Sequence, residues 1–224
     1  MEVFIVVTVL WVFSVCMHEF GHAQVAYWGG DHTVKEKGYL TLNPFLYTHP
    51  VYSLLMPVLM LAMGGIGLPG GAVYIEHQLL RSRWWETAVA LAGIAINWLM
   101  VLFLAAFFKL GIIPDDPTNL ACVAFGLLLQ LEVCAILLNL LPIPSLDGFQ
   151  AIAPWLPHHT REQMFSMSNM SMWVLFLALW FVTPLNQALW DAVFFITSHL
   201  GIDTYNTYFV GMEQYRSVLA GLGL

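Results

Sequence analysis

The sequence predicts an all-α polytopic membrane protein with about four to six transmembrane helices and a small membrane-associated or re-entrant β element. Hydrophobic residues make up 59% and charged residues 9% of the 224 residues, a composition that soluble domains do not show. The apolar residues also gather into long stretches, and about 20 of them in a row allow a helix to cross a bilayer. We therefore expect a single integral membrane domain over residues 1–224.

Four apolar stretches are long enough to form transmembrane helices. They are Val3–Trp28, Trp84–Leu110, Leu120–Leu141 and Met170–Leu189, with room for an interfacial extension at Ala192–Leu200. The first stretch ends at a Gly-Gly pair, and Pro-Asp-Asp-Pro forms a turn between the second and the third. Ionisable residues inside the first stretch distinguish it from a cleaved signal peptide. The core is expected at about residues 1–155, with C-terminal membrane segments at about 165–200.

The region between the first two stretches predicts the β element. Tyr39–Leu42 alternates in the manner of a short strand, and Asn43-Pro44 would end it. Val51–Ile66 is apolar but short, and a Gly-rich run follows it, which favours a re-entrant element that lies against protein. Tyr39–Leu42 or Ala72–Ile75 could pair with an extended peptide by strand addition.

Charge and cysteine content exclude other classes of function. The net charge of −7 comes from 14 acidic and 7 basic residues without a basic stripe, which argues against nucleic-acid binding. Cys16, Cys122 and Cys134 lie in apolar segments without metal-site spacing, so we interpret them as small buried hydrophobic residues.

The first apolar stretch contains His18-Glu19-Phe-Gly-His22. On a helix the i, i+4 spacing places both imidazoles on one face, and Glu19 lies beside them. Such a cluster in lipid costs several kcal/mol unless its members are paired or bind an ion. The pattern therefore predicts zinc ligands at His18 and His22, with Glu19 as the base that deprotonates a water molecule.

A second polar group follows the third apolar stretch. A helix that reaches Asn139 should be broken by Pro142 and Pro144, which leaves Asp147 on an irregular segment. Asp147 is thus a suitable third zinc ligand, because two His and one carboxylate leave the fourth position open, as catalytic zinc sites do. Gly148 would let the backbone pass close to the metal.

Together these motifs resemble the site-2 protease family of intramembrane zinc metalloproteases (peptidase M50). The first motif is the His-Glu-x-x-His segment, and residues 139–148 are similar to the family motif Asn-x-x-Pro-x-x-x-Leu-Asp-Gly. Ala92-Gly93 and Asn97 are similar to its central Gly and Asn segment. Residues 38–44 and the Gly-rich run from Gly64 resemble the short members without PDZ or CBS domains.

The resemblance implies one zinc ion per chain, held by His18, His22 and Asp147, with Glu19 as the general base. It also implies substrates that are transmembrane proteins, as in regulated intramembrane proteolysis, and a multi-pass location in the lipid of a bacterial or archaeal cell membrane. Asn139 is our candidate for donating a hydrogen bond to the oxyanion of the transition state. Asn97 has either an active-site role or a role in binding one helix to another.

The site is expected to face the cytoplasm. For the motifs to meet at one depth, the first and third helices must end on the side where the second begins. Connections on that side carry Lys35, Lys37, Arg81, Arg83 and Arg161, as the positive-inside bias expects.

Other functions remain open on the sequence alone. A catalytically inactive homologue could serve as a scaffold or assembly subunit of a larger membrane complex, and the chain could also form a homo-oligomer. A transporter or channel would need a continuous polar path through the bilayer, whereas the polar residues cluster at one depth. Glu132, in the middle of the third stretch, must be neutral, paired or facing a wet cavity.

Overall fold

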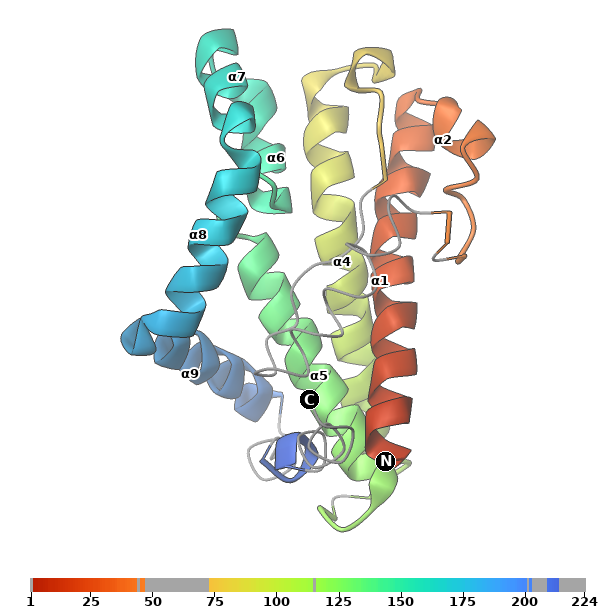
Figure 1. Ribbon diagram of the computed structural model, residues 1–224. Coiled ribbons are helices and arrows are strands. Elements are labelled where there is room, and N and C mark those ends of the chain that lie inside the picture. Colours follow the sequence, from red (N-terminus) through yellow and green to blue (C-terminus); the bar gives the residue numbers. More distant parts are fainter. Residues whose placement is uncertain are drawn as a thin grey trace.

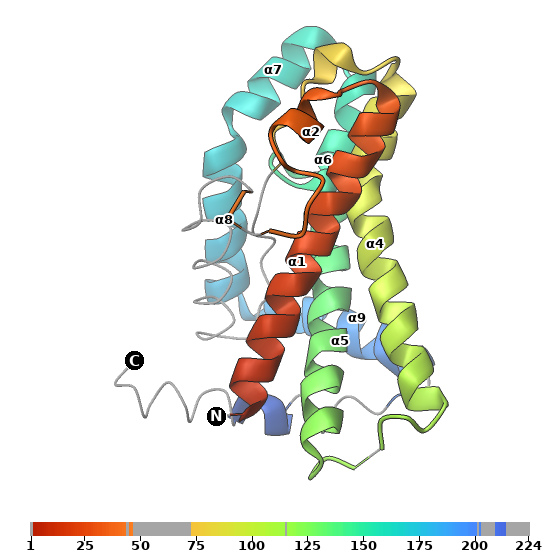
Figure 2. The same cartoon turned by 90° about the vertical axis from the view of Figure 1, so that its right-hand side faces the viewer.

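Three long apolar helices form the centre of the computed structural model, which describes residues 2–43, 45–46, 73–114, 116–200, 202 and 209–213. Each helix is long and apolar enough to cross a membrane, and each packs against the other two (Figures 1 and 2). They are α1 (Glu2–Gly29), α4 (Arg83–Lys109) and α5 (Leu120–Asn139). The chain is therefore a membrane protein built around a three-helix bundle.

Helix α5 is the most enclosed of the three. Of its 18 most apolar consecutive residues, 78% are buried, against 39% for α1 and 50% for α4. Helix α5 therefore has the smallest share of surface left for lipid. The side chain of Asn119 caps the start of α5 by accepting hydrogen bonds from the backbone N–H groups of Ala121 and Cys122. The opposite end of α5, at Asn139, lies near the proline-containing turn that leads to α6.

Helices α1 and α4 approach closely because α1 has a glycine at their contact. A Cβ atom at Gly21 would lie 2.8 Å from the side chain of Ile96 and 3.2 Å from the carbonyl oxygen of Ala92. Small residues let helix backbones approach in membranes, where van der Waals packing drives association. This close packing brings the last turns of α1 against the part of α4 that contains Gly93 and Asn97.

The C-terminal third is a series of shorter helices. They are α6 (Asp147–Ile152), the 3₁₀ turn η3 (Ala153–Trp155), α7 (His158–Ser166), α8 (Ser168–Phe181) and α9 (Thr183–His199). Helices α7 and α8 are bent by 57° relative to each other and could together make a fourth span. From the end of α8 the chain turns, and α9 runs across the lower part of the bundle and packs against α5 (Figure 1).

The predicted fourth helix, Met170–Leu189, is not continuous in the structure. Helix α8 ends at Phe181 and α9 begins at Thr183, because Pro184 has no N–H to continue the α8 hydrogen-bond ladder. The 14 residues of α8 are too few to cross a bilayer alone. The described residues therefore contain three candidate spans, or four with the bent pair, and not five or six.

The predicted strand at Tyr39–Leu42 is also absent. A short helix, α2 (Thr33–Glu36), precedes it, and the backbone N–H of Tyr39 bonds to the carbonyl of Val34. Gly38 adopts a φ of +78°, which turns the chain and prevents an extended start. No strand occurs in any segment that the structure describes, and Val51–Ile66 with the Gly-rich run lies outside those segments.

The close contact at Gly21 predicts that Gly21→Val destabilises the bundle. The added methyl groups would meet Ile96 and the Ala92 carbonyl, and overpacking of this kind costs about 1–3 kcal/mol. Thermal unfolding in detergent should show a lower Tm for Gly21→Val than for wild type. Ala106→Val makes a similar addition at an exposed position of α4 and should leave Tm nearly unchanged. Equal Tm values for the two variants would contradict this packing.

Candidate metal centre

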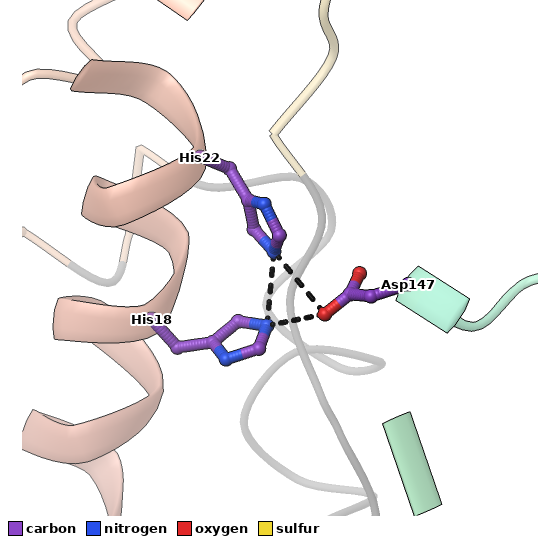
Figure 3. Close-up of side chains that lie close together, drawn as sticks. All are labelled: His18, His22 and Asp147. Carbon is purple, nitrogen blue, oxygen red and sulfur yellow. Dashed lines mark hydrogen bonds and ion pairs between the residues drawn. The ribbon is translucent and has the colours of Figure 1, made fainter. Parts of the chain in front are cut away.

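Two imidazoles project from the same face of α1. His18 and His22 are one turn apart, each is 7% exposed, and their Nε2 atoms lie 3.0 Å from each other (Figure 3). The i, i+4 spacing of the motif produces this convergence because both side chains lie on one helical stripe. The two nitrogens thus face a common point between α1 and the start of α6.

Helix α4 holds the other nitrogen of each ring. His22 Nδ1 donates to the backbone carbonyl of Val89 at 2.7 Å, and His18 Nδ1 lies 3.1 Å from Oδ1 of Asn97. Because both partners are oxygens that accept hydrogen bonds, each Nδ1 carries the proton. A neutral imidazole then has a lone pair on Nε2, so both lone pairs point into the space between the rings.

Asp147 reaches the same space from the far side. Its Oδ2 atom lies 3.2 Å from His18 Nε2 and 3.5 Å from His22 Nε2. Asp147 is the first residue of α6, which follows a turn in which Ser145 has a φ of 94° and bonds through its hydroxyl to the carbonyl of Ser168. The three groups come from two segments about 125 residues apart, and the loop between α5 and α6 brings them together.

Glycine is required at position 148, where the start of α6 lies against the end of α5. A Cβ there would collide with the carbonyl oxygen of Leu140 and would lie 2.7 Å from that of Leu141. The close neighbour of Gly148 is therefore the end of α5, and not the metal centre that the sequence suggested.

The three converging atoms need a cation between them. With both Nε2 atoms unprotonated, no hydrogen lies between the rings and the carboxylate, and Asp147 Oδ2 has no hydrogen-bond partner. Their separations of 3.0, 3.2 and 3.5 Å are close to the edge of a zinc tetrahedron, which is about 3.4 Å for bonds of about 2.1 Å. Two nitrogens and one oxygen with a fourth position open are the donor set of a catalytic zinc site, so these residues fit zinc.

Gly93 of α4 leaves room for both rings. A Cβ at this position would collide with Nε2 of His22 and would lie 2.6 Å from Cε1 and Nε2 of His18. No side chain fits there without displacing an imidazole. The glycine in the central motif thus has a direct steric role at the site.

Glu19 lies beside the three ligands but outside their cluster. Its side chain is buried, and Oε2 accepts a hydrogen bond from the backbone N–H of Val73 at 3.0 Å. Residues 73–76, which have no regular secondary structure, are held in turn by Asp31, whose Oδ2 accepts from the N–H of Glu76 at 2.8 Å. Lys37 contacts the same segment through the Tyr74 carbonyl at 3.2 Å. Glu19 is therefore oriented by a backbone amide and keeps its carboxylate free of the ligand set.

The remaining predicted residues lie near the centre or apart from it. Asn97 and Asn139 are buried and line one pocket together with His18 and Glu19. Glu132 is fully buried on α5 and is not a member of the ligand cluster. Cys16, Cys122 and Cys134 are buried free thiols.

Sequence reasoning missed three contributors to the site. The Val89 carbonyl and the Val73 amide act through the backbone, and no side-chain pattern reveals them. Asp31, which fixes the segment that carries the Val73 amide, is fully buried directly after a Gly-Gly pair. Among these three contributors, only Asp31 had a sequence signal, namely a carboxylate directly after the end of an apolar helix.

Because both imidazole rings lie against Gly93, we predict that Gly93→Ala weakens zinc binding. Displacing either ring misaligns a ligand, and lost support of metal ligands costs about 10- to 100-fold in affinity. Zinc affinity, measured by competition with a chelator, should fall by that amount. The control Ala95→Val adds bulk at an exposed position of the same helix and should bind zinc as wild type does. Unchanged affinity in Gly93→Ala would show that the rings are not confined as described.

Comparison with known proteins identifies relatives over most of the chain. The chain is 40% identical over 204 residues, 91% of its length and 77% of the relative's, to “Putative zinc metalloprotease Rip2” of Mycolicibacterium smegmatis. It is 40% identical over 200 residues, 89% of its length and 76% of the relative's, to the protein of the same name in Mycobacterium tuberculosis H37Rv. “Putative zinc metalloprotease YwhC” of Bacillus subtilis is 32% identical over 194 residues, 84% of each chain.

Two other comparisons gave no match. No family model matches the sequence. No solved structure matches the chain. The extent and identity of the Rip2 and YwhC matches are sufficient to assign the family, and the chain belongs to the site-2 protease family of zinc metalloproteases that includes these proteins.

Proposed function

We propose that the protein is a zinc-dependent intramembrane endopeptidase that hydrolyses peptide bonds in or near transmembrane helices of membrane-protein substrates. The observation that carries this proposal is the convergence of three lone pairs, from His18, His22 and Asp147, beside a carboxylate that is not a ligand. His18, His22 and Glu19 belong to a helix long and apolar enough to cross the membrane. A zinc centre with its own base at that place suits hydrolysis within or near the bilayer.

Glu19 has the position and freedom of a general base. When bound, zinc would acidify a water molecule and polarise the substrate carbonyl. Glu19 would accept the proton of that water and later pass it to the leaving amine. The N–H of Val73 holds one oxygen of Glu19, Oε2, at 3.0 Å, and Oε1 is left for proton transfer. One carboxylate can therefore serve both proton-transfer steps without changing its place.

Two buried asparagines have different roles in this scheme. Asn97 acts through His18, because its Oδ1 fixes the proton on Nδ1 and so keeps Nε2 available for the metal. Asn139 lines the pocket at the end of α5 and would donate a hydrogen bond to the oxyanion, a contact worth about 3 kcal/mol in the barrier.

The substrate must be extended at the cleavage point. A helical backbone keeps its carbonyls in hydrogen bonds, so a transmembrane substrate has to unwind locally before attack. The segment at residues 73–76 has no regular secondary structure and lies beside Glu19. We propose that an unwound substrate segment pairs along the predicted Ala72–Ile75, of which Ala72 lies outside the described residues.

A non-catalytic scaffold is the alternative, and the ligand set does not favour it. A scaffold has no need to keep a carboxylate unligated beside a buried zinc site, because that carboxylate costs burial energy. The Rip2 and YwhC names also describe metalloproteases.

Replacing Glu19 by Gln should separate metal binding from hydrolysis. Gln keeps the size and polarity but cannot accept the proton, so hydrolysis of a model transmembrane peptide should fall by about 10²- to 10⁴-fold. Zinc content of the purified variant should remain at one ion per chain, the stoichiometry that we propose. His22→Ala and Asp147→Ala remove ligands and should lose both zinc and hydrolysis. Full activity of Glu19→Gln would rule out this mechanism.

We also propose that the site opens toward the cytoplasm of a bacterial or archaeal cell. The end of the bundle that carries α2, the start of α4 and α7 is one end of the molecule (Figure 1), and Lys35, Lys37, Arg81, Arg83 and Arg161 lie in or beside these elements. Lys109 lies at the other end of α4. Positive charge of this distribution favours the cytoplasmic side.

An epitope tag inserted between Asp115 and Pro117 tests this orientation. The insertion lies in the turn between α4 and α5, on the opposite side from the site, and should be accessible only from outside the cell. Labelling of intact cells with an impermeant reagent measures its location. A tag that is protected in intact cells and labelled only after permeabilisation would contradict the proposed orientation.

A further inference from the structure

A pocket extends from the metal centre along α1 toward its N-terminus. It begins at His18 and Glu19 and continues past Ser14 to Trp11, which are one and two turns earlier on the same face of the helix. Trp11 is about 10 Å from His18 along the helix axis. Ala135 and Asn139 of α5 form part of the opposite wall. The pocket therefore connects the site of proposed chemistry with the interior of the bundle.

A polar atom without a partner marks the end of this pocket at Trp11. Trp11 is 2% exposed, and its indole Nε1 has no hydrogen-bond partner. Glu132 is fully buried outside the pocket lining, with the Ser14 hydroxyl as a hydrogen-bond partner. The indole N–H of Trp11 costs about 1–3 kcal/mol when it stays unpaired. An unpaired donor at the end of a pocket indicates that an acceptor occupies it.

We propose that this pocket is a side-chain subsite that binds a small hydroxyl side chain next to the scissile bond of the substrate. The inference rests on the proposed peptidase function. Any peptide whose carbonyl lies at the metal and beside Glu19 has a neighbouring side chain near the pocket entrance, because the same residues, His18 and Glu19, form both.

The hydrogen-bonding groups of the pocket fit such a side chain. The indole N–H of Trp11 can only donate, so it requires an acceptor oxygen. Ser14 can donate its hydroxyl hydrogen to the Glu132 carboxyl group, and its own oxygen then accepts a hydrogen bond from the occupant. The hydroxyl groups of serine and threonine side chains each contain both an acceptor oxygen and a donor hydrogen. An aliphatic side chain would satisfy neither Trp11 nor Ser14.

The volume of the pocket limits the size of the occupant. Trp11 lies at one end of the lining, and Val15 and Ala135 contribute apolar surface. The free volume of about 20 Å³ holds about one water-sized group, such as a hydroxyl. Threonine carries a hydroxyl next to a methyl group that can contact Val15 or Ala135 at the entrance. Threonine and valine have nearly the same shape, so a comparison between them isolates the hydroxyl group.

Two model transmembrane peptides that differ only in Thr or Val test the proposal. The substitution is placed at each residue flanking the scissile bond in turn, and kcat/KM is measured with zinc-loaded wild-type enzyme. At one of the two positions we expect the Thr peptide to be cleaved with about tenfold higher kcat/KM, because the Val peptide leaves buried polar groups unpaired. The same ratio is then measured in variants of the pocket.

Trp11→Phe removes the indole N–H and keeps an aromatic ring at the end of the pocket. Ser14→Ala removes the hydroxyl and provides a second, smaller change if Trp11→Phe does not fold. In each variant the Thr to Val ratio should fall toward one, while zinc content stays at the wild-type value. Trp28→Phe makes the same substitution at an exposed tryptophan of α1 and should keep the wild-type ratio.

The outcomes distinguish a failure of the subsite proposal from a failure of the proposed function. A ratio near one at both positions in wild type, or a ratio unchanged in both pocket variants, would overturn the subsite while zinc-dependent cleavage of either peptide keeps the proposed function. Absence of cleavage of both peptides by zinc-loaded protein would overturn the proposed function and the subsite with it.

Discussion

Two hydrogen bonds that the histidines of α1 donate to α4 determine the chemistry of this protein. The Val89 carbonyl and the Asn97 side chain each accept from an Nδ1 atom, which fixes both rings in one tautomer and directs both Nε2 lone pairs toward Asp147. Without these bonds the rings could rotate or carry their protons on Nε2, and no ligand set would form. Gly21 and Gly93 let α1 and α4 pack closely enough for these two hydrogen bonds to form.

The rest of the fold supplies the third ligand and the base to this pair of helices. The prolines and the left-handed Ser145 interrupt the helix after α5, and Gly148 lets α6 begin against the end of α5 with Asp147 pointing toward the histidines (Figure 3). Asp31 and Lys37 fix the segment at residues 73–76, which in turn holds Glu19. Because a buried cluster of lone pairs is repulsive until a cation enters, we expect metal binding to stabilise the fold as well as to permit the chemistry.

Much of the architecture could be predicted because membrane helices are defined by their length and hydropathy. Val3–Trp28, Trp84–Leu110 and Leu120–Leu141 differ from α1, α4 and α5 by no more than two residues at either end. The prediction failed where local backbone chemistry overrides hydropathy. Pro184 divides the fourth apolar stretch, and the positive φ of Gly38 turns a segment whose alternation resembles a strand.

The candidate site was accessible to sequence reasoning only through its side chains. The spacing of His18 and His22 and the proline break before Asp147 both describe groups that the structure brings to one point. The site is oriented by two backbone groups, the carbonyl of Val89 and the amide of Val73, and by the space that Gly93 leaves for the rings. Such contacts depend on how helices pack, which periodicity alone does not specify.

Anomalous scattering at the zinc absorption edge, from crystals of the purified protein, tests the central claim most directly. The account predicts one peak per chain at about 2.0–2.2 Å from Nε2 of His18, Nε2 of His22 and a carboxylate oxygen of Asp147, with Glu19 near the metal but not bound to it. A peak coordinated by Glu132 in place of Asp147, or metal ligation through Nδ1 of either histidine, would contradict it.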